Sequence, residues 1–355
     1  MRVDDQHDRR AIACHSHPAR APAAQIVATS SSTSGRAKML NSSMFLLLVL
    51  TGCQRPDLFA SDAFVIPGGS GMLSASIVRG QSPDTCRGIP GVTVRFYHGD
   101  QLLGEATTGD CGTARLESAL LASATNYRAE ALFDGQSLSA EGAVFNGSPN
   151  RTVIICDIDG TISNTHYREL VFDEEDRASQ PLPGAVETLN ELRKHYGLIY
   201  VTARPGFLRA KTQRWLRNHG FPEAPLIGTP GLAQSIRPDR FKAETIARLQ
   251  TSNSTIRIGI GDARTDSEAY GMTDLLPIIV DDNDDGRFRA HAIVLRDWKM
   301  IREFFDVNAE VLQDPDRLHR VIEQEDQLKR PTRHYQPTRH HTHMADDSAE
   351  ASPRS

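Results

Sequence analysis

Paired aspartates stand directly behind an apolar run near the middle of the chain. The run Val153–Cys156 leads into Asp157 and Asp159, and Gly160 and Thr161 follow. Two carboxylates at a strand end are costly to bury unless a metal ion or strong hydrogen bonds compensate their charge. Because alternate positions along a strand point to the same side, both carboxylates can enter one cavity. A carboxylate can attack phosphorus and form an aspartyl-phosphate, so the pair predicts phosphoryl-transfer chemistry.

Further residues with suitable chemistry follow later in the chain. Thr202 and Arg204 end a second apolar run, Lys242 lies near the start of a helical segment, and Asp262 and Asp266 follow a third apolar run. Carboxylate oxygens are ligands that Mg²⁺ prefers. Phosphoryl transfer needs positive charge and donors against the transferred group, and a lysine and a threonine hydroxyl can supply them. We therefore expect one Mg²⁺-dependent site that uses all of these groups.

The segments that carry these residues alternate between strand and helix patterns from residue 151 onward. Strands are predicted at 153–157, 198–202, 256–260 and 278–280, and helices at 183–197, 207–218, 241–249 and from 265. Such alternation favours a parallel sheet with helices on both faces. Ligands bind to sheets of this kind at the carboxyl ends of the strands, which is where the reactive residues lie. The expected fold class of this part is α/β.

The order of these motifs resembles that of the haloacid dehalogenase (HAD) superfamily. An Asp-x-Asp-Gly-Thr motif, a strand that ends in Thr, a Lys and a Gly-Asp-x-x-x-Asp motif carry the resemblance over about residues 151–300. The resemblance implies a HAD-like Rossmannoid parallel sheet. It also implies that Asp157 is the nucleophile and that Asp159 is first general acid and then general base. An aspartate at the second position is typical of phosphatases and phosphomutases in this superfamily, whereas the transport ATPases have threonine there.

The metal ligands also follow from the resemblance. Asp262 is expected to bind Mg²⁺, and Asp266 is expected either to bind it or to orient Lys242. Asp157 and Asp159 complete the candidate metal ligands. Mg²⁺ prefers carboxylate and water oxygens and usually takes one or two protein carboxylates, which Asp157 and Asp262 can supply.

Residues that contact the substrate can be named as well. The backbone around Gly160 and Thr161 can approach a phosphate closely, because glycine has no side chain. Thr202 and Lys242 are expected to hold phosphoryl oxygens. Arg204 is expected to contact the phosphate or its headgroup, with a structural salt bridge as the alternative.

The short spacing between the motifs predicts a minimal cap and an open site, which in this superfamily tends to serve large substrates or surfaces. Four segments are similar to lipin-type phosphatidate phosphatases: Asp157–Ile162, Thr202–Arg204, Phe241–Lys242 and Thr265–Tyr270. Asp262 and Thr202 depart from lipins, which usually have asparagine and serine there. The favoured function is hydrolysis of phosphatidate or a related lipid phosphate. A periplasmic phosphatase for soluble phosphomonoesters such as nucleotides, and a non-catalytic phosphatidate-sensing module, remain as alternatives.

The N-terminal region resembles a bacterial lipoprotein signal. The apolar run Met44–Leu50 is followed by a Leu-Thr-Gly-Cys segment that ends at Cys53. A bilayer span needs about 20 apolar residues, so the run fits the central part of a signal peptide instead. The resemblance implies a lipid anchor on Cys53 in the bacterial cell envelope, facing the periplasm. Translation from Met1 or from Met39 is compatible with this pattern.

Composition divides the chain into five parts. Residues 1–52 are the expected leader and residues 53–71 a tether. Residues 72–148 contain short alternating segments separated by turn residues, which predicts a β-sandwich module resembling immunoglobulin or transthyretin domains. Residues 150–312 form the phosphatase domain, and residues 313–355 form a terminal helix and a disordered tail that contains histidines.

Cysteine usage and charge complete the expectations. In an exported protein, Cys86 and Cys111 could form a disulfide, with two unpaired thiols as the alternative. The chain has 355 residues and a net charge of -5, which predicts no broad nucleic-acid surface. The sequence does not indicate an oligomeric state.

Overall fold

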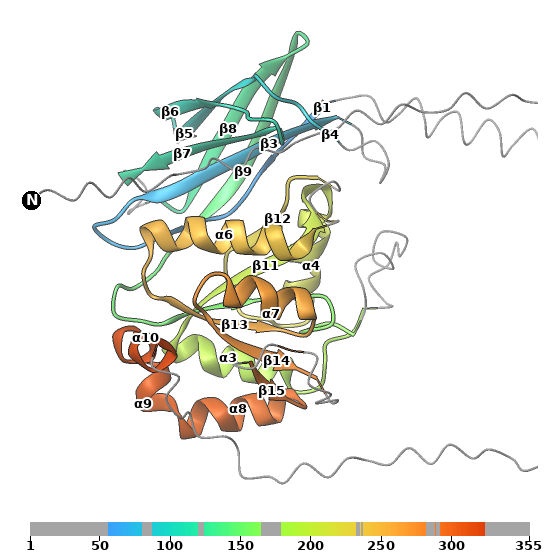
Figure 1. The fold of residues 1–355 in the computed structure, drawn as a ribbon. Coiled ribbons are helices and arrows are strands. Elements are labelled where there is room, and N and C mark those ends of the chain that lie inside the picture. The colour runs from blue at the N-terminus through green and yellow to red at the C-terminus, as the bar shows by residue number, and fades with distance from the viewer. Residues whose placement is uncertain are drawn as a thin grey trace, which may run out of the picture.

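The structure is a computed structural model, and it describes residues 56–79, 87–119, 124–164, 179–231, 235, 237–281, 288 and 292–323. The predicted leader, the anchor residue Cys53, Cys86, most of the predicted flap after Asn164 and the tail lie outside the described residues. Figure 1 shows two parts in contact, a β-rich part built from the first half of the chain and an α/β part built from the second. None of the described helices is long and apolar enough to cross a membrane.

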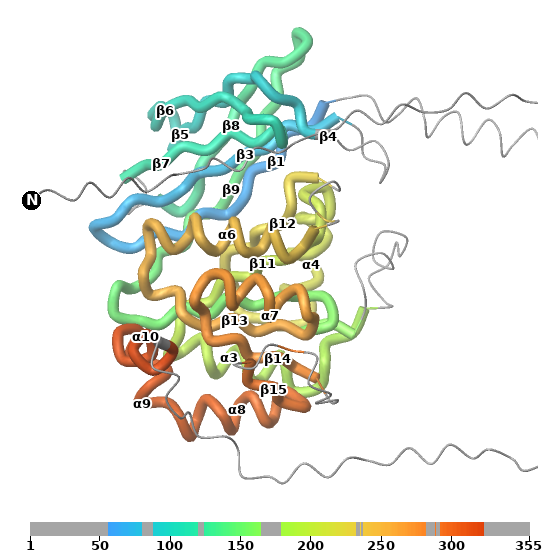
Figure 2. The backbone as a smooth tube through the Cα atoms, viewed as in Figure 1, coloured from blue at the N-terminus to red at the C-terminus, as the bar shows by residue number. Residues whose placement is uncertain are grey.

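The β-rich part consists of two sheets around one core (Figures 1 and 2). Its strands are β1 (Pro56–Ala60), β2 (Ala63–Val65), β3 (Gly71–Arg79), β4 (Arg87–Gly88), β5 (Thr93–His98), β6 (Gln101–Thr107), β7 (Thr113–Ser118), β8 (Asn126–Phe133) and β9 (Gln136–Asn146). One sheet has the order β1-β3-β4 with β7 also paired to β3, and the other has the order β2-β9-β8-β5-β6. Alternate side chains such as Leu73, Phe96 and Tyr127 point inward from both sheets and are buried. This part is referred to below as the β-sandwich.

The predicted tether over residues 53–71 is wrong where the structure describes it. Residues 56–60 form β1, which pairs antiparallel with β3, and residues 63–65 form β2, which pairs parallel with β9. Leu58 and Val65 are buried in the sandwich core. Alternating burial of Leu58 and Ala60 is the period-two pattern of a strand with one buried face.

The α/β part contains one six-stranded sheet. Its elements are β10 (Val153–Cys156), α3 (Ala185–His195), β11 (Gly197–Pro205), the 3₁₀ helix η2 (Gly206–Leu208), α4 (Arg209–Asn218), β12 (Leu226–Thr229), α6 (Pro238–Ser252), β13 (Ile256–Gly261), α7 (Arg264–Gly271), β14 (Leu276–Val280), β15 (Ile293–Leu295), α8 (Trp298–Val307), α9 (Ala309–Leu312) and α10 (Pro315–Glu323). The strand order is β12-β11-β10-β13-β14-β15, and every neighbouring pair is parallel.

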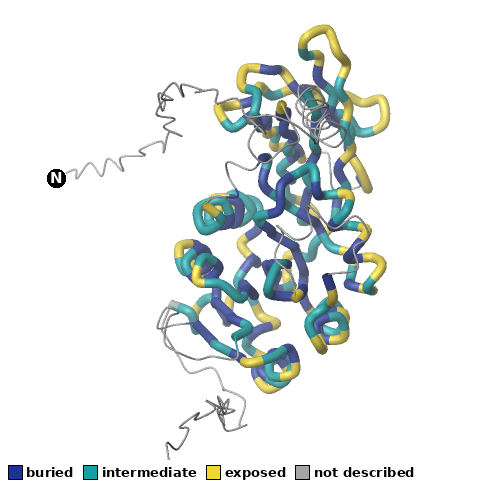
Figure 3. Tube along the Cα trace, turned by 90° about the vertical axis from the view of Figure 1, so that its right-hand side faces the viewer, coloured by how far each residue is buried: buried dark blue, intermediate teal, exposed yellow. Residues whose placement is uncertain are grey.

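Helices cover both faces of this sheet because its strands are apolar on both sides. In β10, Ile154 and Cys156 pack into the core formed with α3, α4 and α8, whereas Val153 and Ile155 pack against the side covered by α6 and α7. Figure 3 shows the buried strands as dark blue segments between helices whose outer faces are exposed. The predicted α/β sheet with two covered faces therefore agrees with the described structure.

The C-terminal boundary of the domain differs from the prediction. We expected a terminal helix from residue 313 that lies outside the phosphatase domain. Instead, α10 ends at Glu323, and its Leu318 is fully buried in the same core cluster as Trp298 of α8. The described part of this helix is therefore packed on the α/β domain.

The β-sandwich covers the edge of the parallel sheet at β12. The backbone N–H of Leu226 points away from β11, and it donates to Asp62 Oδ2 at 2.9 Å. Asp62 Oδ1 accepts from the backbone N–H of Ala143 at 2.9 Å and also pairs with Arg209 of α4. Phe64 of β2 packs into the core of the α/β domain. One buried carboxylate thus connects the two parts and satisfies a group on an otherwise open sheet edge.

Candidate active site

The central strand β10 positions Asp157. All four residues of β10 are buried, and the strand lies between β11 and β13. The N–H of Asp157 donates to the carbonyl of Ile260 at 2.9 Å, which continues the ladder one residue beyond the strand. Asp157 is therefore fixed at the carboxyl end of the sheet, beside the end of β13, where Asp262 follows. It is 5% exposed, so its carboxylate is held away from bulk water.

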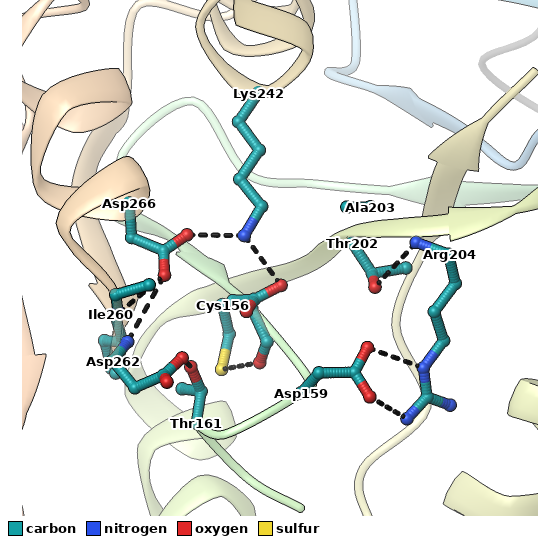
Figure 4. A network of polar contacts seen from close by, with 12 residues as sticks. Cys156, Asp159, Thr161, Thr202, Ala203, Arg204, Lys242, Ile260, Asp262 and Asp266 are labelled. Carbon is teal, nitrogen blue, oxygen red and sulfur yellow. Dashed lines mark hydrogen bonds and ion pairs between the residues drawn. The ribbon is translucent and has the colours of Figure 1, made fainter. Parts of the chain in front are cut away.

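Lys242 of α6 reaches down into the site from the helix at the top of the view in Figure 4. Its Nζ lies 2.9 Å from Asp157 Oδ1 and also donates to Asp266 Oδ1. The lysine is 3% exposed, and Asp266 is fully buried. One ammonium group thus neutralises part of the charge of two buried carboxylates, which makes their burial tolerable.

Asp262 is positioned by the loop that follows β10. Thr161 Oγ1 donates to Asp262 Oδ1 at 2.9 Å. Gly160 has a φ of +79°, and a Cβ at this position would lie 2.1 Å from Asp262 Oδ2. A side chain at position 160 would therefore displace the carboxylate, which explains a glycine here more directly than approach to a substrate does. The Gly160 N–H donates to the carbonyl of Ser163, so it is engaged within the loop.

The two oxygens of Asp266 are already used within the protein. Oδ1 accepts from Lys242, and Oδ2 accepts from the N–H groups of Asp262 and Ala263 at 3.3 and 3.1 Å. These contacts hold the start of α7 and aim the lysine at Asp157. Of the two roles expected for Asp266, orienting Lys242 is the one that its contacts display.

The carboxylates offer a group of oxygens that fits a hard divalent cation. Asp157, Asp262 and Asp266 each present one oxygen, and these atoms lie within 4.8 Å of one another. Oxygen-only donor sets with one or two firmly held carboxylates are typical of Mg²⁺ sites. Asp159, the fourth candidate ligand, is not part of this group. Asp157 and Asp262 would hold the ion, because the oxygens of Asp266 already have partners.

Burial among like charges raises the proton affinity of the cluster. Burial raises the pKa of Asp157 to about 8, and the neighbouring Asp266, Asp262 and Asp159 add to this against the opposing charge of Lys242. The pKa of Asp262 rises to about 6, again chiefly through burial and Asp266. Burial by itself lowers the pKa of Lys242, but Asp157 and Asp266 outweigh it and the net shift is upward. A cluster of this kind is stabilised by a cation that replaces protons.

Asp159 is held apart from the other carboxylates by Arg204. The guanidinium donates through Nε to Asp159 Oδ2 at 2.8 Å and through Nη2 to Oδ1 at 2.7 Å. Nη1 donates to Thr212 Oγ1 of α4 at 3.1 Å, and the side chain of Arg204 is 2% exposed. A bidentate pair fixes orientation as well as charge. Of the two roles expected for Arg204, the salt bridge is the one found, and its partner is the expected acid/base.

Thr202 lies at the same sheet edge but faces a different neighbour from the other candidates. Its Oγ1 accepts the backbone N–H of Arg204 at 3.2 Å, and the residue is 1% exposed. The hydroxyl hydrogen therefore remains able to donate. Figure 4 shows Thr202 between Lys242 and Arg204, on the strand that also carries Ala203.

Two residues that support the site were missed in the sequence. Trp298 of α8 is buried, and its Nε1–H donates to the carbonyl of Thr161 at 2.8 Å. Thr212 fixes the guanidinium of Arg204. Trp298 begins an apolar helical pattern with Ile301, Phe304 and Phe305, so the helix could have been predicted, but its contact with the Thr161 loop is set by the fold.

Other predicted positions lie partly or wholly outside the described residues. Cys53 and Cys86 are not described, so the lipid anchor and the disulfide stay predictions. Cys111 lies in the turn before β7 and is partly buried. The segment 165–178, which contains most of the predicted flap, is also outside the described residues.

Comparison with known proteins gives one family match. Residues 154–278 match the model of the LNS2 domain of PITM 1-3, a span that includes every candidate catalytic and metal-binding residue. No curated protein matches the chain. Together with the carboxylate site, the family match supports a HAD-like, phosphatase-type hydrolase in general.

Three solved structures illustrate a distant likeness. A HAD-superfamily hydrolase from Ehrlichia chaffeensis is 15% identical, covers 45% of this chain and 98% of its own, and has a TM-score of 0.32. The M1 domain of titin is 19% identical, covers 25% of this chain and 93% of its own, and has a TM-score of 0.19. The IgV-like domain of human B7-H4 is 11% identical, covers 26% of this chain and 97% of its own, and has a TM-score of 0.19.

Proposed function

We propose that the protein is a Mg²⁺-dependent phosphatase that hydrolyses a phosphomonoester through an aspartyl-phosphate. The observation that carries the proposal is the buried contact of Lys242 Nζ with Asp157 Oδ1 inside a cluster of three carboxylates. A buried carboxylate beside an ammonium group can act as a nucleophile while the ammonium balances negative charge on the transferred group. The LNS2 match spans these residues and supports the same conclusion.

The residues divide the reaction between them. A carboxylate oxygen of Asp157 attacks phosphorus, and the ester P–O bond breaks. Asp159 gives a proton to the leaving oxygen, then takes a proton from a water that attacks the phosphorus of the aspartyl-phosphate and releases phosphate. Lys242 and the Thr202 hydroxyl face the phosphoryl oxygens. When bound, Mg²⁺ supplies positive charge against the phosphoryl oxygens.

The fork between Arg204 and Asp159 sets a condition on this reaction. Both oxygens of Asp159 accept hydrogen bonds from the guanidinium, so neither oxygen can carry a proton while both hydrogen bonds are in place. Donation to the leaving group needs the protonated form, so at least one of these hydrogen bonds has to open in the first half. We therefore assign Arg204 as the positioning residue of the acid/base.

We propose a lipid phosphate, phosphatidate or a relative, as the substrate. The lipin-like motifs around Asp157 and the LNS2 match support this choice. An anchor on Cys53 in the cell envelope, as proposed from the sequence, would hold the site near a bilayer. This part of the proposal is separate from the reaction itself, because a soluble phosphomonoester would use the same carboxylates.

The test is phosphate release by the purified protein with Mg²⁺ on phosphatidate micelles, para-nitrophenyl phosphate and nucleotides. We expect the highest kcat/KM on phosphatidate and loss of all activity in Asp157→Asn and Asp159→Asn. Retained activity in either variant would contradict the mechanism. Equal rates on the soluble esters with none on phosphatidate would contradict only the choice of substrate.

A phosphatidate-sensing module is the second candidate. The observation that favours it is that Asp159, the expected acid/base, is fully occupied by Arg204. This function predicts that wild type and Asp157→Asn bind phosphatidate vesicles equally and that neither releases phosphate. Turnover by the wild type on any phosphomonoester would exclude a purely sensing role.

A further inference from the structure

The contact between the β-sandwich and the α/β domain encloses a cavity whose lining meets the catalytic site at Thr202 and Arg204. Side chains of β3 and β7 face α6 across it, and the end of β12 closes one side. Ser76, Thr113 and Thr245 contribute hydroxyl groups, and Phe241 and Leu249 contribute apolar walls. The charged residues of the lining are four arginines and one carboxylate: Arg115, Arg204, Arg209, Arg248 and Asp62.

The side chains around this cavity carry more positive than negative charge. Arg204 is committed to Asp159, and Arg209 pairs with Asp62. Arg248 donates to Thr245 Oγ1 at 3.0 Å, and its nearest carboxylate oxygen, on Glu244, is 3.9 Å away. Among the described residues, the side chain of Arg115 makes no hydrogen bond or ion pair, although Glu244 lies near enough to act on its charge. Among the described residues, the carboxylate of Glu244 thus faces both Arg115 and Arg248, and the group keeps a net positive charge.

A buried donor in the same lining also lacks an acceptor. Nε of Arg209 is buried, and no hydrogen-bond acceptor for it exists in the part of the chain that the structure describes. Buried donors in native proteins almost always have a partner, so Nε of Arg209 can donate to a ligand in the cavity that accepts hydrogen bonds. The excess of arginine charge favours a negatively charged ligand. An anion accepts hydrogen bonds and balances charge together.

The size of the cavity limits the ligand. It encloses about 80 Å³. A buried water needs about 10–15 Å³ measured in this way, so the space suits several waters or one small oxyanion, and an acyl chain is too large. Arg115 is exposed and the side chain of Arg248 is 35% exposed, so both charges can be reached from solvent.

We propose that this cavity is a second anion site, which binds a phosphate-type oxyanion through Arg115, Arg248 and the Nε–H of Arg209. The anion is either free phosphate or the phosphate head of a larger ligand whose remainder stays outside. The site joins three elements, since Arg115 lies on β7, Arg209 on α4 and Arg248 on α6. Because α6 also carries Lys242, an anion bound here is held by the helix that positions the catalytic lysine.

The site is tested by calorimetric titration of the full chain with inorganic phosphate in EDTA. Without Mg²⁺, the catalytic carboxylates repel phosphate, and no turnover is required, so the result is independent of the phosphatase proposal. We expect one bound phosphate in the wild type and an affinity at least about tenfold lower in Arg115→Gln/Arg248→Gln, since the double variant loses two charged hydrogen-bond donors. Arg302→Gln on α8 is the matched control, because it removes the same charge far from the cavity, and it should bind as the wild type does.

A second arm separates the two sources of phosphate. Vesicles of phosphatidylcholine with and without phosphatidate are sedimented with wild type and with the double variant, again in EDTA. If the wild type binds free phosphate and the double variant does not, the site is assigned to the free ion. If the wild type binds no free phosphate but binds phosphatidate vesicles, and the double variant loses this vesicle binding, the site is assigned to a lipid head. Arg248→Lys keeps the charge, so it should bind the probe more tightly than the double variant does. This result would exclude a folding defect as the cause of the lost binding. The proposal is overturned if the double variant matches the wild type in both arms or if the wild type binds neither probe.

Discussion

At the scale of single residues, the two aspartates of the Asp-x-Asp motif have opposite surroundings. Asp157 is buried next to an ammonium group and two further carboxylates, whereas Asp159 is held by both arms of a guanidinium. The same residue type can therefore serve as nucleophile at one position and as acid/base at the other, because the environment sets the role.

The first residue-scale prediction concerns how the free energy of unfolding depends on pH when no metal is bound. Burial raises the pKa of Asp157 from 3.8 to about 8, so the folded state binds a proton more tightly than the unfolded state does. The stabilisation is complete below pH 4 and is lost as the pH rises toward 8. In EDTA, the free energy of unfolding should fall by up to about 1.4 kcal/mol per pH unit within this window. Urea unfolding from pH 5 to 8 measures the slope.

Asp157→Asn is the control for this slope. Asparagine does not titrate, so the variant should show a flatter profile and should be more stable than the wild type at pH 8 in EDTA. An unchanged slope in the variant would assign the pH dependence to other groups.

The second residue-scale prediction concerns the bidentate pair between Arg204 and Asp159. Arg204→Lys keeps the charge but loses the bidentate geometry, so Asp159 is no longer fixed in one orientation. We expect kcat to fall about 10- to 100-fold, the equivalent of one charged hydrogen bond, with little change in KM. Thr212→Val removes only the contact behind the guanidinium and should have a much smaller effect. If KM rises and kcat does not change, Arg204 contacts the substrate instead.

At the scale of elements, the loop between β10 and α3 shapes the site through a close approach. Gly160 has left-handed backbone geometry and lies directly against the carboxylate of Asp262. The Thr161 hydroxyl and Trp298 fix the same loop from two sides. The metal-binding carboxylate is thus positioned by a neighbouring loop as well as by its own strand.

Gly160→Ala tests this arrangement. The added Cβ would lie 2.1 Å from Asp262 Oδ2, so the carboxylate has to move and the affinity for Mg²⁺ should fall by more than about tenfold. Gly184→Ala is a matched control, because its φ is +80° and its nearest side-chain atom is 3.5 Å away. Both variants carry a backbone strain of about 1–2 kcal/mol, but only the first should weaken Mg²⁺ binding. Titration of each variant with Mg²⁺ measures the difference.

Much of the sheet could be predicted from the sequence because its strands are continuous apolar runs that end in polar residues. Val153–Cys156 and the Leu198–Val201 part of β11 are of this kind. The edge strand Leu226–Thr229 was missed, since it is short and contains glycine, and its outer side is satisfied by Asp62 from far away in the chain. The partner of Arg204 could not be predicted from the sequence either. An arginine at a strand end can face a substrate or a carboxylate, and only the fold decides which.

At the scale of the whole molecule, the β-sandwich and the α/β domain are joined by a buried polar contact. Asp62 accepts from two backbone N–H groups and pairs with Arg209. Asp62→Ala should lower the free energy of unfolding by about 2–4 kcal/mol, because it leaves buried donors and a charge without partners. Asp57→Ala is the control, since in the described part of the chain Asp57 accepts only from its neighbour Leu58 and should cost less. Urea denaturation of both variants tests this, and equal losses would show that Asp62 has no special role.

The position of Asp62 also has a consequence for the order in which the protein is made. The carboxylate precedes the N–H of Leu226 by 164 residues, so the sandwich that carries it leaves the ribosome long before the sheet edge exists. Domains generally fold as units during synthesis, with the N-terminal one first. When β12 emerges, it meets a surface that already holds an acceptor for its free backbone group, and the nascent sheet edge is shielded from other chains from the moment it forms.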